Sequence, residues 1–241
     1  MVIESVNNER IKEIRKLKEK KHRDKEKKFL VEGEHLALEA YKSGNLEILI
    51  ICDGYDYDMD VNKIFVTKDV IKSISELETP YNVIGICNIK ENDEIGNKVL
   101  LLDNIQDPGN LGTIIRSAVA FNVDTIVLNN KSVDLYNSKV LRAAQGNNFY
   151  INIIRKDLIE FVSLLKKDGY KIYSTNVNNG NDVKNVKTNE KYAIIMGNEG
   201  NGVSADLQDL SDFNIYITMN DKCESLNVAV ATSIILYELN K

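Results

Sequence analysis

The sequence predicts an α/β protein of two domains, the second of which is built on a parallel β-sheet. Short apolar segments alternate with helical segments along most of the chain. In the second half the strand segments are short and apolar and are flanked by helices, which is typical of a parallel sheet covered on both faces. Between the halves, residues 90–98 (KENDEIGNK) are charged and aperiodic, which indicates a domain boundary.

The first half contains runs rich in Val, Ile and Leu that predict strands, with helices between them. The predicted strands are 29–33 (FLVEG), 46–52 (LEILIIC), 63–67 (KIFVT) and 81–89 (YNVIGICNI), and the predicted helices are 34–43 and 68–77.

The second half repeats this alternation, with helices between the strands and no internal repeat. The predicted strands are 99–103 (VLLLD), 125–129 (TIVLN), 171–175 (KIYST), 192–196 (YAIIM) and 214–219 (NIYITM), with a further candidate at 149–153 (FYINI). Residues 176–190 form a polar loop to which the sequence assigns no structure.

A strongly basic segment precedes the first strand. Residues 10–28 hold eleven Lys or Arg against four acids, although the whole chain carries a net charge of −5. Two interpretations stay open: a solvated helical surface, or an arm that contacts nucleic-acid phosphates and binds less tightly as salt rises.

Bulk properties exclude several classes of protein. No apolar run approaches the roughly 20 residues of a membrane span, and the N-terminus lacks the apolar region of a signal peptide. Cys52, Cys87 and Cys223 are far apart and unpaired in spacing, which argues against a disulfide framework and a zinc site. We therefore expect a cytoplasmic protein of one large or two small domains.

Residues 103–122 (DNIQDPGNLGTIIRSAVAFN) predict a turn followed by a helix with Asn110 as its N-cap. An apolar stripe on this helix predicts its buried face, and Arg116 lies off that stripe, above Gly112. Arg116 is either a solvated surface residue or a cation held over the first helical turn. The stripe consists of Leu111, Ile114, Ile115, Ala118 and Val119.

Residues 197–204 (GNEGNGVS) form a glycine-rich loop after a predicted strand. The order of its glycines is the reverse of a dinucleotide-binding motif, and Val203 stands where a phosphate-binding loop has lysine. Glu199 would also place a negative charge inside a phosphate cradle. The loop is either a tight turn or a close backbone approach to another ligand, and Ser204 is expected to cap the next helix.

Residues 224–239 (ESLNVAVATSIILYEL) predict a C-terminal helix that is apolar almost all round and therefore buried. Ser225 and Asn227 open this helix. Capping explains one of these polar residues, whereas the second needs a hydrogen-bond partner of its own.

Read together, the three loops resemble the three motifs of the SpoU (TrmH-like) family of RNA ribose 2′-O-methyltransferases, within the SPOUT superfamily. The motifs are N-x-x-x-x-x-R in DPGNLGTIIRSA, the GNEGNGVS loop, and I-x-M-x-x-x-x-E-S-L-N-V-A-V-A. Two positions depart from the family pattern, since Thr218 and Asp221 stand where proline and glycine are usual.

The N-terminal region also resembles a known domain. N-x-x-I-K at residues 8–12 and F-L-V-E-G at 29–33 are similar to the ribosomal-protein-like substrate-binding domain of the family's rRNA enzymes. We therefore place a substrate-binding domain over residues 1–92 and a methyltransferase domain over residues 97–241.

The resemblance implies a C-terminal trefoil knot, S-adenosylmethionine as the cofactor and a homodimer whose active sites use both protomers. Knots are nearly absent from proteins, so no general folding rule predicts this one. By motif position the cofactor contacts are expected from Gly197, Ile217, Leu226, Met219 and Thr175.

The resemblance also implies roles in catalysis, for which no metal is needed. Arg116 would stabilise the developing charge on a ribose 2′-hydroxyl, because a guanidinium stays protonated and does not accept the proton readily. Asn110, Ser225 and Asn227 would orient the ribose or Arg116, and Glu199 would fix the glycine loop or pair with Arg116.

The expected substrate is 23S rRNA, with guanosine favoured as the methylated nucleotide. Two alternatives stay open from the sequence: a tRNA ribose 2′-O-methyltransferase, and a noncatalytic RNA-binding or assembly factor with the same fold.

Overall fold

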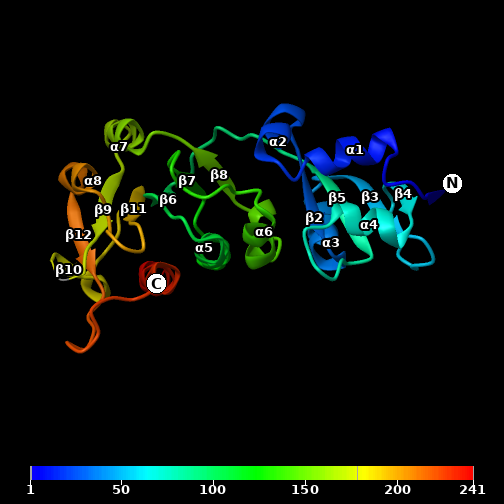
Figure 1. Cartoon of the computed structure of the whole chain (residues 1–241). Helices are drawn as coiled ribbons and strands as arrows, with labels where there is room; N and C mark the ends of the chain where they lie inside the picture. The colour runs from blue at the N-terminus through cyan, green and yellow to red at the C-terminus, as the bar shows by residue number, and fades with distance from the viewer. Residues whose placement is uncertain (1, 178, 241) are drawn as a thin grey trace. The chain divides into compact units, whose positions relative to one another are not determined.

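The computed structural model describes residues 2–177 and 179–240, which form two compact units (Figure 1). The N-terminal unit comprises Met1–Glu91 and Asp134–Phe149, and the C-terminal unit comprises Asn92–Val133 and Tyr150–Lys241. The chain therefore passes between the units near residues 91, 133 and 149. Of these crossings, the sequence indicated the first. No helix in the described ranges is long and apolar enough to span a bilayer.

The N-terminal unit is built on a mixed sheet with the strand order β1-β4-β3-β5-β2. β3 pairs in parallel with β4, whereas β5 is antiparallel to both β3 and β2. The strands are β1 (Val2–Ile3), β2 (Lys28–Glu32), β3 (Leu46–Cys52), β4 (Asn62–Val66) and β5 (Val83–Asn88).

Helices cover both faces of this sheet because successive strand residues point to opposite sides. Ile50 and Cys52 of β3 pack with α1 and α4 residues, whereas Leu49 and Ile51 pack with Ala37 of α3. The helices are α1 (Glu9–Lys16), α2 (Lys20–Glu26), α3 (Glu34–Lys42) and α4 (Lys68–Ile74).

Residues 134–149 leave the C-terminal unit and complete the core of the N-terminal unit. They form α6 (Ser138–Ala144) and the 3-10 helix η1 (Asn147–Phe149). Tyr136 and Phe149 pack on Phe29 of β2, with ring centroids 4.4 and 6.1 Å away. Burial raises the pKa of Tyr136 to about 12. Without this segment, the side chain of Phe29 would lose much of its apolar cover.

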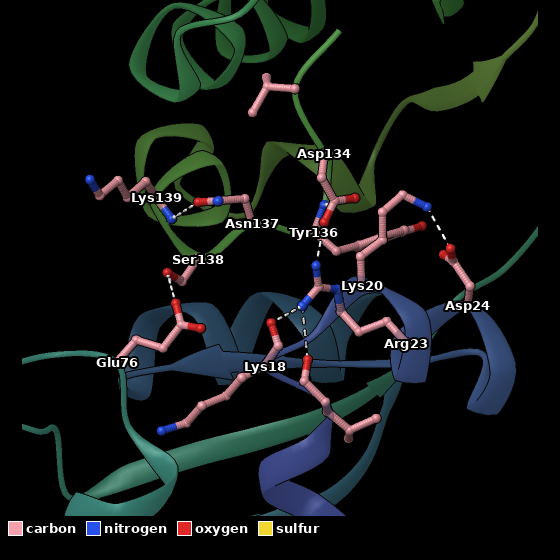
Figure 2. A network of polar contacts seen from close by, with 12 residues as sticks. Lys18, Lys20, Arg23, Asp24, Glu76, Asp134, Tyr136, Asn137, Ser138 and Lys139 are labelled. Carbon is pink, nitrogen blue, oxygen red and sulfur yellow. Dashed lines mark hydrogen bonds and ion pairs between the residues drawn. The ribbon is translucent and has the colours of Figure 1, made fainter. Parts of the chain in front are cut away.

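A buried arginine ties the same segment to the basic N-terminal region, as Figure 2 shows. Arg23 of α2 is 7% exposed and forms an ion pair with Asp134. Its guanidinium also donates to the carbonyl oxygens of Leu17, at 2.9 Å, and Lys18, at 2.5 Å. Arg23 therefore serves the fold of this unit, although it belongs to the basic segment.

The C-terminal unit contains a parallel sheet, as predicted, with the strand order β10-β12-β9-β11-β6-β7-β8. The strands are β6 (Lys98–Leu102), β7 (Thr125–Leu128), β8 (Asn152–Arg155), β9 (Lys171–Thr175), β10 (Asn181–Asp182), β11 (Tyr192–Met196) and β12 (Phe213–Tyr216). From β6 the chain adds β7 and β8 on one side of the sheet and β9, β11 and β12 on the other, so the direction of strand addition reverses between β6 and β11. In open parallel sheets, ligands bind at the carboxyl ends of the strands beside such a switch point.

Two pairs of helices lie on opposite sides of this sheet (Figure 1). α7 (Leu158–Lys167) and α8 (Ala205–Leu210) pack on the face that carries Val99 and Leu101. α5 (Pro108–Ala120) and α9 (Val228–Leu239) pack against each other on the other side. The hydroxyl groups of Ser117 and Ser233 lie 2.6 Å apart between these two helices.

Several details of the C-terminal unit differ from the sequence prediction. The strand predicted at 214–219 ends at Tyr216, and the helix predicted at 224–239 begins at Val228. The candidate strand at 149–153 begins later, at Asn152, because residues 147–149 form η1 in the other unit. Part of the unassigned loop at 176–190 forms β10 and the 3-10 helix η2 (Val183–Asn185). Within that loop, residue 178 lies outside the described residues.

The Arg23–Asp134 pair predicts a large stability difference between two substitutions. Asp134→Ala should lower the free energy of unfolding by about 3 kcal/mol, because it leaves a buried charge unpaired. Asp24→Ala, which removes the exposed partner of Lys20 on the same helix, should cost less than about 1 kcal/mol. Urea unfolding followed by far-UV circular dichroism measures both, and equal losses would contradict a structural role for Arg23.

Candidate active site

A cavity of about 390 Å³ opens at the carboxyl ends of β9, β11 and β12. Its walls come from the ends of these strands, the glycine-rich loop, the segment before α9 and the first turns of α9. All five residues expected to contact a cofactor line this cavity. They are Thr175, Gly197, Ile217, Met219 and Leu226.

The glycine-rich loop folds back tightly on itself. The backbones of Asn198 and Gly202 exchange two hydrogen bonds of 2.9 and 3.0 Å. A Cβ atom on Gly197 would lie 2.0 Å from the carbonyl carbon of Gly202, so no other residue fits there without moving the loop. Gly202 has φ +68°, a left-handed conformation that favours glycine. The loop therefore needs glycine at these two positions for reasons of geometry.

Two polar side chains that the sequence did not single out hold the loop in place. Asn198 donates to the carbonyl oxygen of Asn104 at 2.8 Å and accepts from the backbone N–H of Gly200 at 2.9 Å. The buried carboxylate of Asp103 accepts from the backbone N–H of Ser204 at 2.9 Å. Ser204 precedes α8 as expected, but its own side chain makes no capping hydrogen bond. Asp103 directly follows β6, and this position at the carboxyl end of a strand was the feature of the sequence that could have marked it as a site residue.

Asn110, Glu199 and Asn227 meet through their side chains, as their common assignment to one site requires. The amide of Asn110 donates to Glu199 Oε1 at 3.0 Å, and the amide of Asn227 donates to Asn110 Oδ1 at 2.9 Å. In sequence, Asn110 is 89 positions from Glu199 and 117 positions from Asn227. Glu199 thus fixes the glycine loop to the start of α5.

The predicted cap of α5 is wrong in position. Asp107, not Asn110, is the N-cap, and its side chain accepts from the Asn110 backbone N–H at 2.8 Å. Pro108 occupies the first helical position, where proline is well tolerated. Because Asp107 performs the capping, the Asn110 side chain is free to bridge Glu199 and Asn227.

The predicted opening of α9 is confirmed for one of its two polar residues. The Asn227 side chain caps α9 by accepting from the backbone N–H groups of Ala229, at 2.9 Å, and Val230, at 3.3 Å. Ser225 does not cap the helix but lines the cavity. α9 is less buried than predicted, since Val230 is 48% and Tyr237 55% exposed.

Arg116 does not join this group within one chain. It is exposed on α5 and is not among the residues that line the cavity. Its guanidinium makes no hydrogen bond or ion pair with the rest of the described chain, so the expected alternative of a Glu199–Arg116 pair is not formed. The apolar stripe of α5 is buried as predicted, apart from partial exposure of Val119.

The cavity lining is mostly neutral. Glu199 is its one charged side chain among the described residues, and no Lys or Arg lines it. The lining includes Ile217, Leu226 and Ile235, so it suits a neutral or cationic ligand with apolar surface better than a nucleoside triphosphate. Beside it, hydrogen bonds from the Thr218 hydroxyl and a backbone N–H hold the pKa of Asp182 below its ordinary value.

The parallel sheet and this cavity thus define an α/β protein with a loop-lined cavity at the carboxyl ends of its strands, beside the switch point. A model of the SpoU rRNA Methylase family matches residues 97–237, and one of the MRM3-like substrate binding domain matches residues 8–85. This chain belongs to the SpoU rRNA methylase family. The resemblance inferred from the three motifs is therefore confirmed.

Several relatives match over nearly the whole chain. The 23S rRNA (guanosine(2553)-2′-O)-methyltransferase RlmP of Bacillus subtilis (strain 168) is 41% identical over 243 residues, covering 98% of each chain. Two crystal structures of an rRNA methyltransferase from Sinorhizobium meliloti, the second described as AdoMet bound, have TM-scores of 0.87 and 0.86 at 28% identity. Each covers 99% of this chain and 96% of that chain.

A tRNA enzyme matches less of the chain. The TrmH/SpoU tRNA modifying enzyme of A. aeolicus has a TM-score of 0.54 at 25% identity and covers 61% of this chain and 75% of its own.

The double role of Asn227 predicts different effects of two substitutions on stability. Asn227→Ala removes the α9 cap and should cost about 1 kcal/mol, or a fall of about 3 °C in Tm. Asn227→Asp keeps an oxygen that can accept from Ala229 and Val230, so its Tm should stay within about 1 °C of the wild type. Thermal melts followed at 222 nm test this, and equal losses would show that the hydrogen bond to Asn110 matters more than the cap.

Proposed function

We propose that this protein transfers a methyl group from S-adenosylmethionine to a ribose 2′-hydroxyl of 23S rRNA, with guanosine as the methylated nucleotide. The observation that carries this proposal is the hydrogen-bonded group of Asn110, Glu199 and Asn227, which we call the junction. It lies beside the cavity that the glycine-rich loop lines. A ribosomal RNA substrate is supported by the full-length match to an rRNA enzyme and by the partial match to a tRNA enzyme. Such a substrate is consistent with the cytoplasmic location that we expect from the unpaired spacing of the three cysteines.

The cavity fits S-adenosylmethionine by the chemistry of its lining. Gly197, Ile217 and Leu226 would hold the cofactor largely through backbone groups, with Thr175 and Met219 beside it. The tight approach of Gly197 to Gly202 supports this role, because it keeps the loop free of side chains at that point. When bound, the cofactor supplies an electrophilic methyl group carried on a sulfonium.

The residues joined to Glu199, together with Ser225, would orient the acceptor ribose. Asn110 and Asn227 hold each other by a hydrogen bond, and Glu199 holds Asn110. A held amide can present a donor or an acceptor to a ribose hydroxyl at little further entropic cost. Ser225 lines the cavity and adds a hydroxyl that can donate or accept.

Arg116 would activate the nucleophile electrostatically. A ribose 2′-hydroxyl is a poor nucleophile near neutral pH, and its oxygen gains negative charge as its proton leaves. A guanidinium can bind the adjacent phosphate and stabilise that charge at the same time. Since Arg116 does not line the cavity of its own chain, we propose that it acts at the cavity of a second protomer.

A homodimer formed through α5 and α9 would bring Arg116 to the second site. α9 carries Val230 and Tyr237 exposed, which are apolar surfaces that favour burial between copies of the chain. A trefoil knot that ends at α9 belongs to the same proposal, and the TM-scores to family structures support it.

The geometry of the glycine loop predicts a cofactor-binding defect. Gly197→Ala should weaken S-adenosylmethionine binding by at least about tenfold, because its Cβ would collide with the backbone of Gly202. Gly200→Ala is a matched control, since its Cβ would meet nothing closer than Asn198 Oδ1 at 3.6 Å. Isothermal titration calorimetry measures both, and failure of the wild-type protein to bind the cofactor would favour a noncatalytic factor.

The placement of Arg116 predicts complementation between two inactive variants. Arg116→Ala should slow methyl transfer to RNA by about 100-fold or more while leaving S-adenosylmethionine affinity unchanged. A heterodimer of Arg116→Ala and Gly197→Ala protomers, isolated with two affinity tags, should regain about half of wild-type activity, because one site has both working parts.

Two outcomes would contradict this arrangement. An inactive heterodimer would place Arg116 at the cavity of its own chain. Absence of any doubly tagged species would show that the protein is not a dimer.

A further inference from the structure

A second cavity, of about 510 Å³, lies at the carboxyl ends of β6 and β7 and is lined by the starts of α7 and α8. It shares Asn198, Asn201 and Gly202 with the first cavity, so the glycine loop is the wall between them. The same loop carries Glu199, which binds Asn110 at the proposed methyl-acceptor site. A group that occupies the second cavity would therefore be separated from the proposed cofactor by this loop alone.

The lining of this cavity combines apolar surface with hydrogen-bonding groups. Leu158, Ile159 and Leu207 contribute apolar surface, and Ile159 is 45% exposed. Lys131 supplies a cationic donor, and amide groups come from asparagine side chains on three loops. These amides are Asn104, Asn129, Asn130, Asn198 and Asn201.

Two of the three carboxylates in the lining have oxygens available for a ligand. Asp103 is engaged by the backbone of Ser204 and the amide of Asn129. Asp157 uses Oδ1 to cap α7, and its Oδ2 accepts no hydrogen bond from the residues described. Asp206 forms no hydrogen bond or ion pair with any described residue, although it faces solvent at the start of α8.

We propose that this cavity receives the guanine base of the nucleotide that is methylated, with Asp206, assisted by Asp157, reading its N1–H and N2–H₂ donors. The inference rests on the proposed function and adds the residues that choose the base. Enzymes that do chemistry on a base turn it into a pocket, hold it between apolar side chains and read its Watson–Crick edge, and we extend this mode of recognition to an enzyme that acts on the attached ribose. The apolar surface of Leu158, Ile159 and Leu207 is suited to the base plane.

The carboxylates make the cavity selective for guanine. Guanine presents two adjacent donors, which a carboxylate can accept as a bidentate pair, and its O6 can accept from Lys131. Adenine and cytosine present an unprotonated ring nitrogen at the corresponding edge, which a carboxylate repels. Uracil has one donor between two acceptors. These bases would therefore be rejected because they leave polar groups unpaired or repelled. Such groups discriminate between ligands more strongly than differences in apolar contact do.

The test compares guanosine with inosine, which lacks the N2 amine, at the methylated position of a synthetic RNA. The RNA corresponds to the 23S rRNA segment around guanosine 2553, the nucleotide in the name of the Bacillus subtilis relative. For the wild type we expect kcat/KM to fall by about tenfold or more with inosine. Asp206→Asn should reduce this ratio to about twofold by slowing transfer to guanosine.

One control variant and one further test variant accompany this measurement. Asp209→Asn changes an exposed carboxylate on α8 outside the cavity lining and should keep the wild-type ratio. Asp157→Asn keeps a side chain able to cap α7 and tests the second carboxylate. S-adenosylmethionine affinity should stay unchanged in all three variants, because none of the substituted residues lines the first cavity.

Each outcome decides the proposal. A lower ratio in either Asp206→Asn or Asp157→Asn supports the base pocket. A wild-type ratio in both variants overturns it, as does an inosine effect confined to a neighbouring nucleotide. Absence of methyl transfer by the wild-type protein would overturn the proposed function itself, and with it the role of this cavity.

Discussion

The hydrogen bonds that join Asn110, Glu199 and Asn227 are the constraint on which the candidate site depends. A parallel sheet brings the loops after its strands to one edge, but it does not fix their positions relative to one another. These side chains do so, by linking the starts of α5 and α9 to the glycine loop. Each exposed hydrogen bond contributes only about 1 kcal/mol, so the junction relies on the better buried support that Asp103 gives to Ser204.

The glycine loop has different chemistry on its two sides. The first cavity has no lysine or arginine and one carboxylate among its described lining residues, whereas the second has Lys131 and three carboxylates. A loop this thin is possible because Gly197 lies against the backbone of Gly202, where a side chain would force the two segments apart. The close approach of Gly197 to Gly202 thus lets a single loop separate the two cavities.

Local features of this fold could be predicted from the sequence, and nonlocal ones could not. Strand β3 has the predicted bounds because a buried strand is a nearly continuous apolar run, here interrupted by Glu47 alone. The cap of α5 was misplaced because Asp107 and Asn110 are both good caps and only the packing of the loop chooses between them. The packing of residues 134–149 in the N-terminal unit has no local signal in the sequence, because it depends on contact between Arg23 and Asp134, which are 111 positions apart.

The structure divides the basic segment into two kinds of cation. Arg23 is buried with Asp134, and Lys18 donates to the carbonyl oxygens of Ser73 and Ser75, where burial lowers its pKa. Neither can reach a phosphate without disrupting the unit. Lys20 and Lys27 instead form exposed ion pairs with nearby acids, and such pairs are weak enough for a phosphate to replace the carboxylate. Any phosphate contact made by residues 10–28 therefore falls to the exposed cations, while the buried ones hold the fold of the unit.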